Sequence, residues 1–231
     1  MRSTFVDLYI YTFIEINMPT IAFLSQKGGA GKTTLATCIA RQLQLDGLDV
    51  ILIDSDPQGS ARDWRAATEQ DTVLVVGLDR PTLDKDIKAL SDGGKKWVII
   101  DGAPRNEAMT LSAIKAADLV LIPVQPSPYD VWASEDLVSI IKTRQEITDG
   151  KPKAAFLISR AIRRTELSRD VFSALQELGL PVFEHFTTQR QIYPKAAAVG
   201  LTPADMEGEG EAAKEIRAII QEISTFVEIN K

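Results

Sequence analysis

Apolar residues along this chain fall into two patterns: short continuous runs, and longer stretches in which they recur every three or four positions. Continuous runs such as 50–53 and 97–100 are typical of strands buried on both faces of a sheet. The runs predict strands at 20–24, 50–53, 73–76, 97–100, 119–122 and 155–158, the fifth closed by Pro123, with a last short strand at 181–183. The periodic stretches predict helices after residue 34 and at 60–69, 83–90, 107–116, 131–147, 166–178 and 212–227.

This alternation predicts a single doubly wound α/β domain, in which a mostly parallel sheet carries helices on both faces. No internal repeat or linker interrupts it, so we expect the domain to span 18–231. Residues 1–17 are apolar and aromatic but contain Asp7 and Glu15, and they are too short to cross a bilayer. We interpret 1–17 as an N-terminal extension, either disordered or derived from an upstream start codon. A membrane-touching or partner-binding segment is the alternative.

The first predicted strand leads into a glycine-rich segment, S-Q-K-G-G-A-G-K-T-T at 25–34. It matches the phosphate-loop pattern G-x-x-x-x-G-K-[ST] of nucleoside triphosphatases. Glycines there let backbone N–H groups face the phosphates, and the following helix presents its positive N-terminus. The expected phosphate contacts are Gly28, Gly29, Ala30, Gly31, Lys32, Thr33 and Thr34, with the Thr33 hydroxyl on Mg²⁺ and Lys27 at the start of the loop. The alternative is an ordinary glycine-rich turn.

Acidic residues follow two other predicted strands. Asp54 and Asp56 come after 50–53, and Asp101 comes after 97–100. Because ligands of open α/β sheets bind at the carboxyl ends of the strands, these acids and the phosphate loop can converge. The alternative is that each aspartate caps the turn that follows its strand.

The two lysines of the loop change the interpretation. K-G-G-x-G-K-T-[ST] resembles the deviant Walker A motif of the ParA/MinD family, and D-S-D-P-Q at 54–58 resembles that family's switch segment. The resemblance covers 18–231 and is closest in type to the small plasmid-partition members, the ParF-like proteins. It implies an ATPase with ATP and Mg²⁺, in which Thr33, Asp54 and Asp101 surround the metal. It also implies that Asp56 orients the attacking water and that Lys27 crosses to the phosphates of a second subunit. Segments containing Arg160 and Gln189 resemble those that flank the adenine.

The resemblance also implies partners. These are a second copy of the chain in an ATP-bound homodimer, non-specific DNA, and a ParB-like or centromere-binding stimulatory protein. The implied location is the cytoplasm, in association with the nucleoid. Net charge is −6 and the sequence pI is about 5.0, so DNA must meet a local basic patch. The candidates are Arg163, Arg164, Arg169 and Lys195, with Arg160 and Arg190 nearby. Solvated surface arginines are the alternative.

Other members of the same fold need features that this chain lacks. The only cysteine, Cys38, cannot supply the ligands that iron–sulfur relatives need, and we expect it to be buried packing. His185 has no ligand-spaced neighbours and is interpreted as structural. The last predicted helix is acidic, which favours packing on the domain over the basic membrane helix of MinD-like division regulators and argues against stable membrane insertion. A metabolic phosphate-loop enzyme such as dethiobiotin synthetase remains the alternative from another class.

Overall fold

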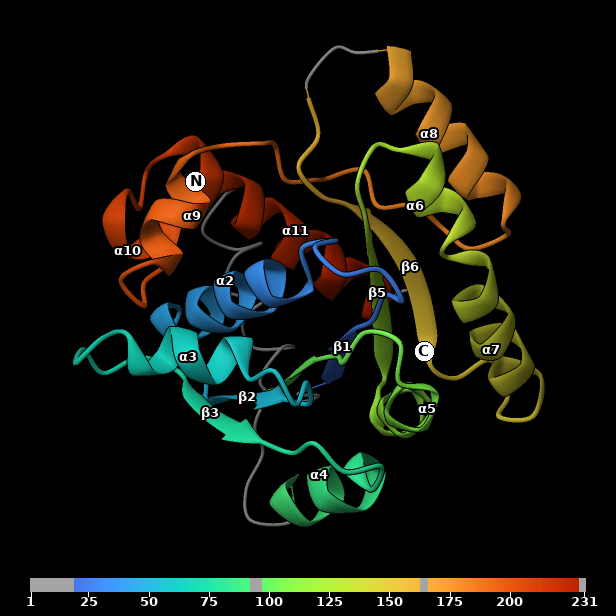
Figure 1. The fold of residues 1–231 in the computed structure, drawn as a ribbon, viewed down its shortest axis with the longest axis horizontal. Coiled ribbons are helices and arrows are strands. Elements are labelled where there is room, and N and C mark those ends of the chain that lie inside the picture. Colours follow the sequence, from blue (N-terminus) through green and yellow to red (C-terminus); the bar gives the residue numbers. More distant parts are fainter. Residues whose placement is uncertain (1–18, 92–96, 163–165, 229–231) are drawn as a thin grey trace.

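A computed structural model describes residues 19–91, 97–162 and 166–228. Its centre is a six-stranded sheet in the order β3-β2-β4-β1-β5-β6, and every neighbouring pair is parallel (Figure 1). The strands are β1 (Thr20–Phe23), β2 (Val50–Asp54), β3 (Leu74–Gly77), β4 (Trp97–Asp101), β5 (Leu119–Val124) and β6 (Lys153–Ile158). The predicted fold class is confirmed. The expectation for residues 1–17 lies outside the described residues.

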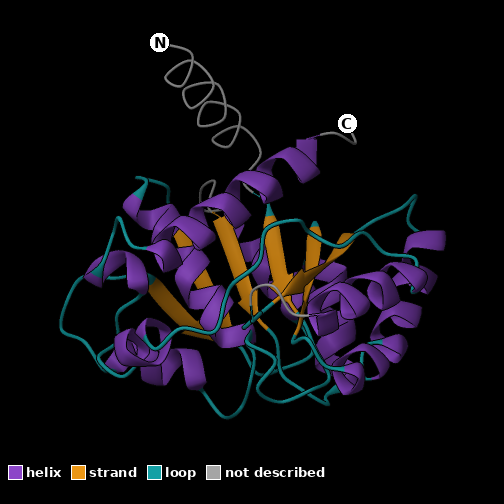
Figure 2. Cartoon of the chain, turned by 90° about the horizontal axis from the view of Figure 1, so that it is seen from above, coloured by secondary structure: helices purple, strands orange, loops and turns teal. Residues whose placement is uncertain are grey.

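Helices cover both faces of the sheet, and Figure 2 shows the strands lying side by side among them. The longer ones are α2 (Lys32–Leu45), α4 (Leu83–Ser91), α5 (Glu107–Ala116), α7 (Glu135–Glu146), α8 (Glu166–Glu177) and α11 (Glu211–Glu228). The shorter ones are α3 (Ser60–Ala66), α6 (Pro128–Trp132), α9 (Ile192–Ala197) and α10 (Pro203–Met206). Alternate residues of each strand point to opposite faces, so the sheet divides two apolar cores. Helices α2 and α11 pack on one face, and α5, α7 and α8 pack on the other.

The central strand places the glycine-rich segment. Strand β1 lies between β4 and β5, and the chain leaves its carboxyl end directly into the loop that precedes α2. Gly102 lets the end of β4 approach this point, because a Cβ there would lie 2.4 Å from Leu24 Cδ2 and 2.6 Å from the Phe23 carbonyl oxygen. The loop therefore emerges at the middle of the sheet's carboxyl edge, with β2 and β4 on one side and β5 and β6 on the other.

Several predicted boundaries were wrong for identifiable reasons. Pro123 does not close β5, which continues to Val124. Strand β1 ends opposite Leu121, so beyond that point β5 has no neighbour on that side that needs a proline N–H. The helix predicted at 131–147 is two helices, α6 and α7, which meet at Ser134, whose hydroxyl donates to the Asp130 carbonyl (2.8 Å).

The expected strand at 181–183 is only an isolated bridge between Phe156 and Val182. Helix α3 ends at Ala66 rather than Glu69. Helices α9 and α10 were not predicted, because six and four residues are too few to show a helical period.

Candidate nucleotide-binding site

The loop between β1 and α2 has the conformation that a phosphate loop requires. Gly29 and Gly31 have φ angles of 78° and 99°, which favour glycine, and Gly31 caps α2. Two side chains, one directly after β5 and one directly after β6, bind the loop's outer carbonyls. Gln125 Nε2 donates to the Gly29 oxygen (2.5 Å), and Ser159 Oγ donates to the Ala30 oxygen (2.7 Å). Since the first N–H groups of a helix have no acceptor within it, the loop ends in a set of donors suited to an anion.

Lys32, the first residue of α2, lies under this loop. The residue is only 7% exposed, and its Nζ donates to the Lys27 carbonyl (3.2 Å). Burial lowers the pKa of Lys32, while the carboxylates of Asp101 and Asp56 act in the opposite direction. The ammonium group is thus held between the loop and the acidic ends of β2 and β4. An anionic ligand there would offset the energetic cost of burying its positive charge.

Asp54 and Asp101 end adjacent strands and face each other in register. Asp101 is 1% exposed, and neither of its carboxylate oxygens has a hydrogen-bond partner among the described residues. Burial raises the pKa of Asp101 to about 7, an effect that the nearby Thr33 hydroxyl and Lys32 ammonium only partly offset. A buried carboxylate without partners, next to a threonine hydroxyl, fits a hard cation such as Mg²⁺.

Unlike Asp101, Asp54 accepts hydrogen bonds at both carboxylate oxygens. One oxygen accepts from the Asp56 backbone N–H (3.1 Å), and the other accepts from the Arg62 backbone N–H (3.0 Å) and Nε (3.4 Å). Asp54 is completely buried, and Arg62 also donates to the carbonyls of Asp56 (3.1 Å) and Pro57 (3.4 Å). These contacts tie the segment 54–58 to the start of α3. A place for Asp54 in the metal shell stays a prediction.

Asp56 is half-buried at the open side of this cluster. Its Oδ1 accepts from the Gln58 backbone N–H (3.0 Å). Its charge acts on both Lys32 and Asp101, so the three side chains share one site. Among the described residues no group of three or more His, Cys, Asp or Glu side chains is arranged to hold a metal by itself.

Lys27, the lysine that opens the loop, pairs with a side chain outside the loop. Its Nζ contacts the carboxylate of Asp130 on α6. The Lys27 side chain is 41% exposed, whereas that of Asp130 is 3% exposed, and Asp130 Oδ1 has no hydrogen-bond partner within the described chain. Exposed Tyr129 and Trp132 flank this pair and pack edge to face, with ring centroids 5.4 Å apart.

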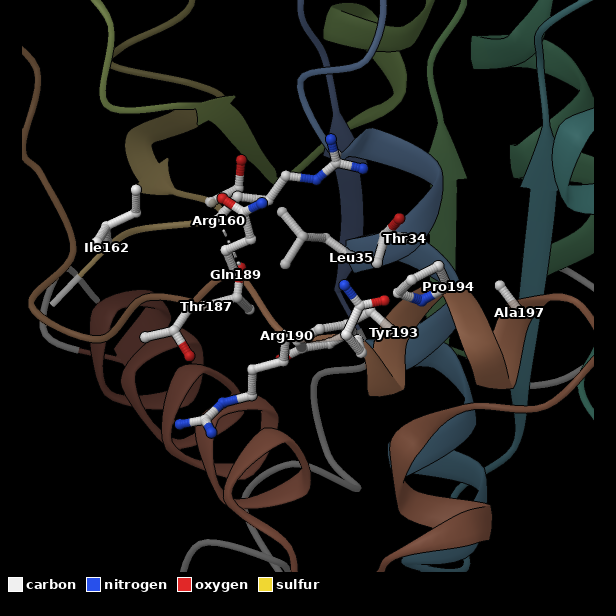
Figure 3. Close-up of a pocket in the computed structure, with 14 residues that line it drawn as sticks. Thr34, Leu35, Arg160, Ile162, Thr187, Gln189, Arg190, Tyr193, Pro194 and Ala197 are labelled. Carbon is white, nitrogen blue, oxygen red and sulfur yellow. Dashed lines mark hydrogen bonds between the residues drawn. The ribbon is translucent and has the colours of Figure 1, made fainter.

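A cavity of about 800 Å³ opens beside the N-terminal turn of α2. Figure 3 shows the residues that line it, which come from α2, the end of β6 and the segment up to α9. Arg160 and Gln189, both expected near the base, lie on the same wall. Arg160 has a φ of 54°, and its backbone N–H donates to Thr187 Oγ1 (3.3 Å). The remaining lining residues are Gly31, Thr34, Leu35, Ser159, Ile162, Thr187, Thr188, Arg190, Gln191, Tyr193, Pro194 and Ala197.

Comparison with known proteins decides the family. Residues 21–204 match the CobQ/CobB/MinD/ParA nucleotide binding domain. This chain belongs to that family. It is 32% identical over 209 residues to the Maintenance of carboxysome distribution protein A of Halothiobacillus neapolitanus, which covers 88% of this chain and 95% of the relative. It is 31% identical over 181 residues to Protein ParA of Rhizobium radiobacter, which covers 76% and 81%.

Solved structures of other proteins share the fold. The structure of a Cyanothece McdA variant in complex with ATP matches this chain with a TM-score of 0.67 at 18% identity, covering 93% of this chain and 98% of the other. The resemblance to a ParA-family deviant Walker ATPase is therefore confirmed. Family membership supports nucleotide binding by the domain. The individual site residues stay predictions.

Most of the basic residues expected to contact DNA lie outside the described part of the chain. Arg163 and Arg164 lie outside the described residues, as does the side chain of Arg169. Lys195 is exposed on α9. Arg190 forms an ion pair with Glu215 (3.0 Å), so much of its charge is satisfied within the chain. The DNA contacts stay predictions.

Other expectations have clearer outcomes. Cys38 is buried, and burial raises the pKa of its thiol to about 12, as expected for packing. His185 Nδ1 pairs with Glu222 Oε2 (2.9 Å) on α11, a structural contact. The apolar side of α11 packs into the core through Ala213, Ile219 and Ile223, as predicted. Within the part of the chain that is described, no helix is both long and apolar enough to cross a membrane.

Several site residues were missed from the sequence: Arg62, Gln125, Asp130 and Glu215. Gln125 and Asp130 fall in a proline-rich segment that resembles the family's, but no periodic or motif signal gives them a contact with the loop. Their partners are 96 and 103 residues away.

Proposed function

We propose that this protein is an ATPase that dimerises around two ATP molecules and binds DNA without sequence preference in that state. Hydrolysis, stimulated by a partner protein, would reset it and so position a DNA molecule or a protein cargo. The observation that carries the proposal is Lys27, the additional lysine at the start of the loop. Its side chain is 41% exposed and forms an ion pair with Asp130. A phosphate loop that acts alone has no need of it.

The chain's own residues would bind and orient ATP within one subunit. The loop amides and Lys32 would hold the β- and γ-phosphates, and the cavity wall around Arg160 and Gln189 would hold the base. Thr33 and Asp101 would hold Mg²⁺, which when bound supplies positive charge to the phosphate oxygens. Asp56, half-buried beside Lys32 and Asp101, would orient the attacking water.

Dimerisation would complete the site. In the single chain Lys27 is bound to a buried carboxylate, and the γ-phosphate of a second subunit would offer it a stronger anionic partner. The lysine would then stabilise transition-state charge in trans, as an arginine finger does. This arrangement makes hydrolysis depend on association, which gives a switch rather than a constitutive enzyme.

The relatives support both kinds of cargo. One is named for carboxysome distribution and the other is a ParA protein. We therefore propose a cytoplasmic, nucleoid-associated positioning ATPase whose partner is a small stimulatory protein of the ParB type or its cargo-specific equivalent. A MinD-like role is disfavoured, because the apolar side of α11 is already buried against α2 and the sheet.

The test is DNA binding to an unrelated duplex at two salt concentrations, with ADP and with ATP. We expect binding only with ATP. Each neutralised phosphate adds about 0.9 to the log–log salt slope, so three or four charges per subunit in a dimer give a slope near about −6. Arg163→Ala with Arg164→Ala should flatten the slope by about 3 to 4.

The matched control is Lys85→Ala with Lys88→Ala, which removes the same charge from the exposed surface of α4. It should leave the slope nearly unchanged. Indifference to DNA in both nucleotide states, together with rapid ATP hydrolysis by the protein alone, would instead favour the metabolic-enzyme alternative.

A further inference from the structure

One wall of the nucleotide cavity is held by a buried carboxylate on the C-terminal helix. Glu215 of α11 is 8% exposed. Its Oε1 accepts from Thr188 Oγ1 (2.7 Å) and from Arg190 Nε (3.1 Å) and Nη2 (3.0 Å). Its Oε2 accepts from the Thr188 backbone N–H (3.1 Å) and the Tyr193 hydroxyl (3.1 Å). All three donor residues line the cavity.

These contacts set the position of the wall from behind. On its other side the same segment pairs with Ala161, just beyond β6. The Ala161 N–H donates to the Thr187 carbonyl (2.8 Å), and the Gln189 N–H donates to the Ala161 carbonyl (3.1 Å). Thr187 and Gln189 are therefore fixed by Ala161 on one side and, through Thr188, by Glu215 on the other. In Figure 3 the Arg190 side chain points away from Thr34 and Leu35.

A buried carboxylate is costly unless it is paired and hydrogen-bonded, and this one is. Burial and the Glu215 charge also raise the pKa of Tyr193, so its hydroxyl stays protonated as a donor. Removing Glu215 would take away the acceptor to which the Arg190 guanidinium, the Thr188 N–H and the Tyr193 hydroxyl donate next to the cavity. The phosphate loop is held by other side chains, because Gln125 and Ser159 bind its outer carbonyls.

We propose that Glu215 is a positioning residue for the nucleoside end of the ligand, which makes recognition of the base depend on the C-terminal helix. This rests on the proposed function, in that the cavity is taken to hold the base of ATP. Glu215 acts through Thr188, Arg190 and Tyr193, whereas recognition of the polyphosphate depends on the loop. The two halves of the ligand should therefore respond separately to substitution.

The experiment compares ATP with inorganic tripolyphosphate, both with Mg²⁺, by calorimetric titration of the full chain. Wild type should bind ATP more tightly, because only ATP uses the cavity. Glu215→Ala should lose about tenfold or more in ATP affinity, with tripolyphosphate affinity within about twofold of wild type. Glu215→Gln keeps the size and one acceptor oxygen but loses the ion pair, so it should retain part of the preference for ATP.

The matched control is Asp205→Asn. The Asp205 side chain is 6% exposed and pairs with Arg41 Nε (2.8 Å), joining α10 to α2, and Asp205 is not among the cavity's lining residues. It should lower the thermal midpoint and leave the ratio of ATP to tripolyphosphate affinity unchanged. If Glu215→Ala does not fold, Glu215→Gln and Tyr193→Phe still test the ratio.

The outcomes separate the two proposals. A wild type that prefers ATP, with Glu215 variants that keep the full preference, overturns the role of Glu215 and leaves the nucleotide site standing. Parallel loss of both ligands would make Glu215 a general stability residue and also overturn its positioning role. A wild type that does not distinguish ATP from tripolyphosphate would refute the nucleoside cavity itself, and with it this inference.

Discussion

The contact between Lys27 and Asp130 predicts that the single chain resists dimerisation until its lysine is released. Asp130 is buried, but the Lys27 side chain is 41% exposed, so solvent screens the pair. We therefore expect the pair to stabilise the free chain by only about 1 kcal/mol. A dimer in which both lysines cross must break two such pairs, at a cost of about 2 kcal/mol. Asp130→Asn, which keeps the shape and removes the charge, should then tighten the ATP-dependent dimer by about 30-fold.

Sedimentation velocity with a non-hydrolysable ATP analogue measures this dimer constant. Asp136→Asn is the matched control, because it removes the same charge from an exposed position on α7. It should leave the constant within about twofold of wild type. The affinity of the single chain for the analogue should be the same in all three proteins.

An unchanged or weaker dimer in Asp130→Asn, with nucleotide affinity intact, would contradict the reasoning. It would mean that Lys27 does not leave Asp130 on association, or that the carboxylate is itself needed at the interface. Lys27→Ala gives an independent check in the absence of nucleotide. It strands a buried carboxylate and should lower the thermal midpoint more than Asp130→Asn does.

Two further predictions concern residues on either side of the loop. Asp56→Ala should leave ATP affinity nearly intact while the hydrolysis rate measured by phosphate release falls by two to three orders of magnitude, about 3–4 kcal/mol. Equal losses in binding and turnover would instead make Asp56 a metal or structural residue. Cys38 should react with a thiol reagent at pH 8 only as the chain unfolds in urea, because burial raises its pKa to about 12. Immediate reaction in native buffer would show that α2 is not packed as described.

The strands could be predicted closely because each is a continuous apolar run that ends at a polar or glycine-containing turn. The phosphate loop and strand-end aspartates could be predicted too, since their chemistry is written in adjacent residues. Parallel pairing then brings Asp54 and Asp101 together at the sheet edge, as the ends of two neighbouring strands must be.

The contacts that tune the site could not be predicted in the same way. Lys27 and Asp130 are 103 residues apart, and Glu215 lies 27 residues from Thr188. Each carboxylate is charged and would be placed on the surface by composition alone. It is buried here because a cation or several donors from another element meet it, and only the assembled fold decides that.

If two chains share each ATP site, mixing two inactive variants should restore hydrolysis. Lys32→Ala lacks the lysine of its own loop, and Lys27→Ala lacks the one proposed to cross. In a mixed dimer, the Lys27→Ala chain keeps its own Lys32 and receives Lys27 from its partner. With half of the dimers mixed and one of two sites complete, hydrolysis should recover to at most about a quarter of the wild-type rate. A mixture no more active than the sum of its separate components would contradict the claim.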